Sequence, residues 1–180
     1  RLLPGSADNV ENAALYHEVD RALAPLRFPF ADLSVGRQAI AWGTARVVNP
    51  TDVIVPYRFT ALDTEYRKGV DAVRFRAPFG SFSELDLGAV FGEDFRFERS
   101  AFFARGRLYV LQTDVSMLSM IFRENLLWGL SLSRAIGEAG AWLEAAYVLP
   151  DAVGPPDDLY AGDYVSLSVG VDRNIAADLY

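Results

Sequence analysis

The stretch from Asp163 to Asp172 reads DYVSLSVGVD, and it is the clearest guide to the fold of this chain. Every second residue in it is aliphatic, and the residues between are small or polar. Because side chains of a β-strand alternate between the two faces of a sheet, this strand would have one apolar and one polar face. Such sorting is typical of the wall of a membrane-spanning β-barrel, with the apolar row facing outward. The aliphatic residues are Val165, Leu167, Val169 and Val171.

Further candidate strands follow one another at short intervals. In one of them, Trp128, Leu130 and Leu132 alternate with glycine and serine, as the first stretch does. Another is ambiguous because its two methionines fall on opposite faces. In that strand we expect the outward row to be Leu118, Met120 and Phe122. The expected strands are 101–111, 114–122, 126–135, 140–149 and 163–172.

A hairpin is expected between Val70 and Phe91, turning about Gly80. A three-residue turn at 79–81 would set two apolar pairs on one face and two pairs of opposite charge on the other. Two such charge pairs on one face support this register. The expected pairs are Phe75 with Leu85, Val73 with Leu87, Arg76 with Glu84, and Arg74 with Asp86.

Before this hairpin, residues 32–43 read as a strand with a bulge near Gly36, because the aliphatic residues change parity along it. Such a bulge would turn Arg37 toward the interior. A barrel requires an earlier strand, and we expect it at 13–22, where helical spacing is the alternative. A long segment separates residues 43 and 68.

The expected links between strands alternate in length. Links at 79–81, 112–113 and 136–139 are short, those at 93–100 and 150–162 are longer, and 123–125 is short but out of phase. Outer-membrane barrels have tight turns on the periplasmic side and longer loops outside. The alternation therefore favours an antiparallel, up-and-down transmembrane β-barrel with about nine strands.

Composition narrows the classes further. The chain has 180 residues, 51% of them hydrophobic, no cysteine and a net charge of −7, which argues against a nucleic-acid partner. The longest run without a charged residue, 125–133, is nine residues, whereas a transmembrane helix needs about 20. No linker divides residues 1–180, so we expect one barrel segment. The first residues lack the features of a signal peptide, which suggests a removed segment or an excerpt.

Three stretches carry a resemblance to a known group of proteins. They are VGRQAIAWG at 35–43, NPTD at 49–52 and GVDAVR at 69–74. In these stretches the chain resembles porin-like bacterial outer-membrane β-barrels of largely uncharacterised role. The resemblance implies that Arg37 lines a pore and that the following loop folds into the lumen. About nine strands is an odd and small number for such a barrel, so the resemblance also implies a part of a larger one.

Charged residues on the polar faces are the candidate pore lining. A charge on the lipid side near the midplane costs about 2 to 4 kcal/mol for Arg or Lys, so these side chains should face an aqueous lumen, where they would bias ion passage. The alternative is that they pair across strands in a filled interior. The candidate pore-lining residues are Arg37, Arg74, Arg76, Glu84, Asp86 and Glu144.

The long loop supplies a second set of candidates. If it enters the barrel, its charges would form a constriction; the alternative is an ordinary solvated loop surface. These residues are Asp52, Asp63, Glu65, Arg67 and Lys68.

Aromatic residues lie toward the ends of expected strands, where their rings suit the membrane boundary. Trp142 shares the parity of Glu144 and is expected to face inward instead. The other residues are Trp42, Trp128, Tyr147, Phe79 and Phe91.

Enzymatic chemistry has little support. His17 is the single histidine, and its acidic neighbours Glu18 and Asp20 are close in sequence only. No nucleophile elbow, phosphate loop or dinucleotide fingerprint occurs, and no spacing indicates a metal site or a cofactor.

The sequence therefore predicts a porin-like channel in the bacterial outer membrane, with lipid around it and small hydrophilic solutes diffusing through it. Two alternatives remain: a soluble barrel that binds a small apolar ligand, and an outer-membrane barrel enzyme. Alternation cannot distinguish the inside of a barrel from its outside.

Overall fold

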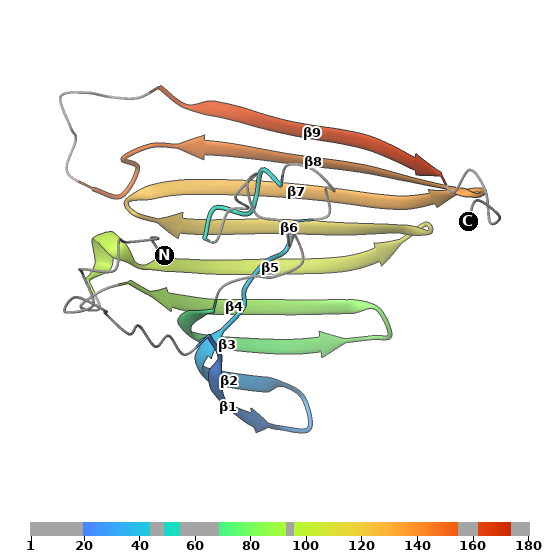
Figure 1. The fold of residues 1–180 in the computed structure, drawn as a ribbon. Coiled ribbons are helices and arrows are strands. Elements are labelled where there is room, and N and C mark those ends of the chain that lie inside the picture. The colour runs from blue at the N-terminus through green and yellow to red at the C-terminus, as the bar shows by residue number, and fades with distance from the viewer. Residues whose placement is uncertain (1–19, 44–48, 55–68, 93–95, 155–161, 174–180) are drawn as a thin grey trace, which may run out of the picture.

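The computed structural model describes residues 20–43, 49–54, 69–92, 96–154 and 162–173. Nine strands within them form one antiparallel sheet in chain order (Figure 1). Strands β1 and β9 are its two edges, so the sheet is open. This confirms the expected all-β, up-and-down architecture of nine strands and is consistent with a partial barrel. No helix in the described part of the chain has the length and apolar character needed to cross a membrane.

Strand boundaries agree with the expected ones to within one residue from position 101 onward. A short 3-10 turn, η3 (Phe97–Arg99), precedes β5. The strands are β1 (Ala22–Arg27), β2 (Asp32–Gln38), β3 (Val70–Phe79), β4 (Ser83–Phe91), β5 (Ala101–Val110), β6 (Thr113–Phe122), β7 (Asn125–Ile136), β8 (Ala139–Leu149) and β9 (Tyr164–Arg173).

Link lengths alternate as expected. The links 28–31, 80–82, 111–112 and 137–138 lie at one end of the sheet, and the opposite end carries the longer ones and the short 123–124. Three links have two residues, and in two of them, 111–112 and 123–124, φ is positive at each position, which is the backbone that a tight hairpin turn requires. We refer to these ends as the short-link end and the long-link end.

The β3–β4 hairpin differs from the expected register. Its turn is 80–82, one residue later than expected, and Gly80 begins it with φ +69°. Moving the turn by one residue moves every pair by two, so Arg76 lies opposite Asp86 and Phe75 opposite Leu87. Arg74 and Asp86 still form the expected ion pair, as diagonal neighbours, but the expected register of the four pairs is wrong. Their faces are right, because a shift of two conserves the alternation.

The first hairpin corrects two further expectations. The strand before position 32 is β1, and most of the expected stretch 13–22 lies outside the described residues. Strand β2 ends at Gln38, and its pairing with β1 and β3 runs unbroken through Gly36, so the expected bulge is wrong. The aliphatic pattern changes parity at Ile40 because the chain has already left the sheet there.

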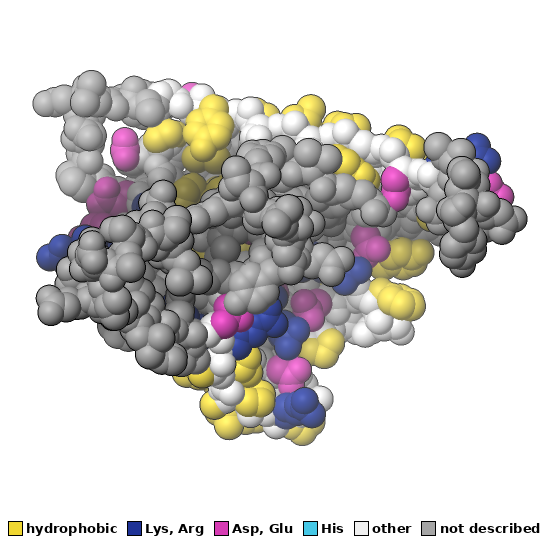
Figure 2. All heavy atoms as spheres, viewed as in Figure 1, with side chains coloured by type: hydrophobic (Ala, Val, Ile, Leu, Met, Phe, Trp, Pro, Cys, Tyr) yellow, Lys and Arg dark blue, Asp and Glu magenta, His cyan; other side chains and the backbone are white. Residues whose placement is uncertain are grey.

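The two faces of the sheet have opposite surroundings. Residues 39–43 and 49–54 cross one face, which we term the covered face (Figure 1). The other, the open face, carries exposed aliphatic side chains, including Met117, Leu130 and Val165, Leu167, Val169 and Val171 of β9. Seen from the covered side, acidic and basic side chains intermingle over β2–β4 (Figure 2).

Strand β6 reverses one expectation. Leu118 and Met120 lie on the covered face, where both are buried, whereas Met117 is 60% exposed on the open face. The outward row expected there is therefore wrong. The covered face needs an apolar zone because an apolar segment packs on it.

A compact core fills the space between this segment and the long-link half of the sheet. Ile40 and Trp42 from the segment pack with Phe103, Met120 and Leu127 from the strands. The rings of Trp42 and Phe103 meet edge to face, with their centroids 4.5 Å apart. Each such side chain contributes about 1.5–3 kcal/mol when it is fully buried, so the core attaches the segment firmly to the sheet.

Two strand glycines provide a test of this packing. A Cβ at Gly129 on the covered face would lie 2.5 Å from Cγ2 of Thr51, whereas a Cβ at Gly106 would meet nothing within 4 Å. Gly129→Ala should lower the free energy of unfolding by about 1–3 kcal/mol through overpacking. Gly106→Ala should leave it unchanged or raise it slightly. Denaturant titration of both variants measures this, and equal effects would contradict the packing of Thr51 on β7.

Candidate functional site

A buried carboxylate on β8 holds the crossing segment. Glu144 is fully buried. Its Oε1 accepts two hydrogen bonds from Thr51, one from the backbone N at 3.0 Å and one from the side-chain Oγ1 at 2.7 Å. Because a carboxylate is costly to bury without hydrogen bonds, these contacts are what make the position of Glu144 tolerable. They fix residue 51 over the middle of β7 and β8.

A second buried carboxylate, on β4, holds the other part of the segment. Asp86 is 1% exposed and accepts a hydrogen bond from Nε1 of Trp42 at 3.0 Å. The guanidinium of Arg74 binds the same carboxylate through two nitrogens, at 2.8 and 2.6 Å. This forked pair is the strongest geometry for arginine and a carboxylate. It leaves Arg74 and Asp86 neutral as a unit.

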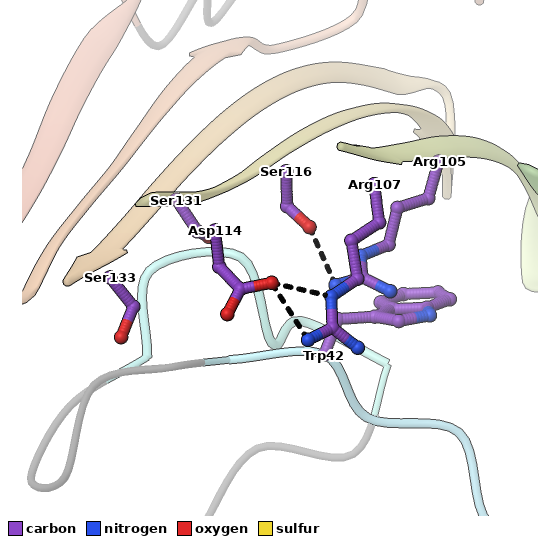
Figure 3. Close-up of a pocket in the computed structure, with 7 residues that line it drawn as sticks. All are labelled: Trp42, Arg105, Arg107, Asp114, Ser116, Ser131 and Ser133. Atoms are coloured by element: carbon purple, nitrogen blue, oxygen red, sulfur yellow. Dashed lines mark hydrogen bonds and ion pairs between the residues drawn. The ribbon is translucent and has the colours of Figure 1, made fainter. Parts of the chain in front are cut away.

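Next to these anchors lies a polar cavity of about 370 Å³ (Figure 3). Strands β5, β6 and β7 form its wall, and Trp42 of the segment closes one side. Arg107 binds Asp114 through Nη2 at 2.8 Å and Nε at 3.1 Å, and Arg105 donates from Nη2 to Oγ of Ser116 at 2.6 Å. The cavity is lined by Trp42, Arg105, Arg107, Asp114, Ser116, Ser131 and Ser133.

Five of the six expected pore-lining residues lie on the covered face by strand register. Arg74 and Asp86 pair with each other across strands, as in the alternative, whereas Glu144 is bound by Thr51 of the crossing segment. Arg76 and Glu84 are partly exposed.

Arg37 is the exception. It lies opposite Asp71 at the end of β2 and shares the open face with Val35, and its Nε donates to the carbonyl of Gly69 at 3.3 Å. The expected inward orientation depended on the bulge, and the unbroken register contradicts it.

Of the expected constriction residues, only Asp52 is described. It is 4% exposed, within the segment that crosses the covered face, and its backbone N donates to the carbonyl of Asn49 at 3.1 Å. Asp63, Glu65, Arg67 and Lys68 lie outside the described residues, as does His17. Among the described residues, no cluster of acidic, histidine or cysteine side chains suits a metal ion.

The sequence did not predict the cavity, although the alternation of residues along β5 indicates part of its lining. Arg105 and Arg107 alternate with Phe102, Ala104 and Leu108 along β5, so parity alone would have put both arginines on the polar face. Nothing local indicates that Trp42 returns to the sheet. We expected it near a strand end, but it lies in the core instead.

Other aromatic residues do gather near the ends of the strands. Trp128 and Tyr147 stack across β7 and β8 on the open face near the long-link end, with centroids 6.1 Å apart. At the short-link end the rings of Phe82 and Tyr109 lie 5.4 Å apart. Trp142 lies on the covered face, as expected, with its ring over Gly170.

No protein-family model, curated protein or solved structure matches this chain. The resemblance to porin-like barrels therefore stays a prediction.

Replacing Thr51 tests the Glu144 anchor. Thr51→Val removes the hydroxyl donor to a buried carboxylate, so we expect a loss of about 1–3 kcal/mol in the free energy of unfolding. Thr113→Val is the matched control, because its hydroxyl makes a long, exposed contact of 3.4 Å to the carbonyl of Leu111. A denaturant titration followed by tryptophan fluorescence compares the two. An unaffected Thr51→Val protein would contradict the anchoring role.

Proposed function

We propose that this chain forms part of the wall of an outer-membrane β-barrel through which small hydrophilic solutes diffuse. The segment that crosses the covered face would narrow the passage. The lumen would lie on the covered side, where Arg74, Asp86, Arg105 and Glu144 gather, and lipid would lie on the open side.

One observation carries this proposal: the exposed face is the apolar one. Val165, Leu167, Val169 and Val171 are 62–72% exposed, whereas Asp86 and Glu144 are at most 1% exposed. In water this inverts the usual distribution, since a large contiguous apolar patch marks a surface that something covers. Acyl chains would cover a whole sheet face evenly.

The dimensions of the sheet support the same proposal. Strand β6 has ten residues, about 33 Å at a rise of roughly 3.3 Å per residue. With the tilt of about 45° usual for transmembrane strands, it would span roughly 25 Å, the height of the apolar band of an outer-membrane barrel. Aromatic residues near both ends would then lie at the two boundaries.

The open sheet edges set a condition on the proposal. An unpaired backbone group costs several kcal/mol in hydrocarbon, so β1 and β9 would both need partner strands in a membrane. Further strands or a second copy of the chain would supply them. The passage is then bounded by more wall than these nine strands provide.

The alternatives to a channel are a soluble ligand-binding barrel and an outer-membrane enzyme. A soluble barrel around an apolar ligand requires the aliphatic rows to enclose the ligand, and the exposure of those rows argues against it. An enzyme would depend on His17, which lies outside the described residues. The cavity on the covered face is polar rather than apolar in its lining, which suits hydrophilic solutes.

Conductance is the direct test of passage. The full protein, reconstituted in planar bilayers, should give discrete current steps, and a salt gradient should give a reversal potential that reports its ion preference. A heat-denatured sample serves as the control. Absence of current from folded, membrane-inserted protein would reject the channel and leave the sheet architecture unaffected.

A pair of arginine substitutions tests membrane contact separately. Met117 and Leu111 are 60% and 84% exposed, the first in the middle of β6 and the second in a turn at the short-link end. In a membrane, Met117→Arg should cost about 2–4 kcal/mol and Leu111→Arg about 0–1 kcal/mol. In water both changes should be nearly neutral.

Folding free energies in lipid vesicles, obtained by denaturant titration, give the comparison. Equal, small effects of the two substitutions would contradict a lipid-facing open face.

A further inference from the structure

Within the described part of the chain, one arginine of the polar cavity, Arg105, forms no ion pair. Arg105 lies opposite Asp86 in the β4–β5 pairing, but the Asp86 carboxylate is already bound by Arg74 and Trp42. Among the described residues, the hydrogen bond of Arg105 to the Ser116 hydroxyl is its only one, and no carboxylate lies within ion-pair distance. A half-buried guanidinium held in this way retains donors for an anion.

Among the residues that line the cavity, two arginines and one aspartate leave one positive charge in excess. Arg107 is neutralised by Asp114, which leaves Arg105 as the uncompensated charge of the lining. Two carboxylates of the covered face outside this lining are already bound, Asp86 by Arg74 and Trp42 and Glu144 by Thr51. The site therefore suits a ligand with a single negative charge.

The cavity also presents hydroxyl groups. Ser131 and Ser133 line it, and neither hydroxyl bonds to another residue in the described part of the chain. Each hydroxyl can both donate and accept, which suits a ligand with hydroxyl groups of its own. Trp42 adds an aromatic wall (Figure 3). A volume of about 370 Å³ is at the small end of ligand sites.

We propose that this cavity is a binding site for small hydroxylated monocarboxylates, the class of the sugar acids. Arg105 would bind the carboxylate through two nitrogens, and the serines would bind the hydroxyl groups. A carboxylate matches the single excess charge, whereas a phosphate dianion would leave a negative charge uncompensated. The inference deepens the proposed function, on which it rests for the route by which the ligand reaches the cavity.

Titration calorimetry of the full protein in detergent at low ionic strength tests the site. The probes are gluconate, the uncharged polyol sorbitol and glucose 6-phosphate. We expect gluconate to bind at least tenfold more tightly than sorbitol and more tightly than glucose 6-phosphate. Arg105→Gln should weaken gluconate binding by about ten- to a hundredfold, the range for a hydrogen bond to a charged group.

Arg134→Gln is the matched control, since it removes the same charge from an exposed position on the open face. It should bind gluconate as the unchanged protein does. The denaturation midpoint of each variant reports folding. If Arg105→Gln does not fold, Arg105→Lys takes its place; it keeps the charge, loses the fork, and should show an intermediate affinity.

Several outcomes overturn the inference. Equal binding of sorbitol and gluconate would remove the role of the charge, tighter binding of glucose 6-phosphate would reassign the site to phosphates, and unchanged affinity in a folded Arg105 variant would remove the arginine. Conductance separates the two proposals. Current without gluconate binding rejects only the site, and gluconate binding without current rejects only the channel.

Discussion

Two buried carboxylates hold this structure in its observed form. Asp86 on β4 and Glu144 on β8 lie four strands apart, and each accepts hydrogen bonds from the same crossing segment, through Trp42 and Thr51. A buried carboxylate without donors is strongly unfavourable, so each one specifies where the segment must lie. The apolar core between segment and sheet then supplies most of the free energy, while the carboxylates supply the position.

Features of the fold that depend on neighbouring residues could be predicted from the sequence, and features that depend on distant contacts could not. Alternation is local, so the strands from β5 onward and the faces of the β3–β4 hairpin could be predicted from neighbouring residues. The turn at Gly80 was misplaced by one residue because the chain offers two adjacent three-residue turns with small residues. Leu118 and Met120 were misassigned because their burial depends on a segment far away in sequence. Thr51 and Glu144 are 93 residues apart, and no local pattern connects them.

The charged residues of the covered face were expected either to line an aqueous lumen or to pair with one another across strands. Some of these charged residues bind each other or the crossing segment, and others are partly exposed. Asp86 and Glu144 bind the crossing segment, and Arg74 binds Asp86. Arg105 lies opposite Asp86 in the β4–β5 pairing, but that carboxylate is already bound by Arg74. These contacts leave Arg105 without an ion-pair partner among the described residues. A guanidinium bound by one serine hydroxyl, with two further serines beside it, arises from the pairing pattern of three strands rather than from any single motif.

The two edges of the sheet are not equivalent, and this asymmetry bears on how a barrel would close. Strand β1 has six residues with Pro25 in its middle, and a proline deprives an edge of one backbone donor. Strand β9 has ten residues, no proline, and valines that favour extended pairing. A new strand would gain a longer and more regular ladder on β9 than on β1. If closure is required by hydrocarbon on the open face, extension from β9 is its least costly route, and β1 would join last, with a shorter seam.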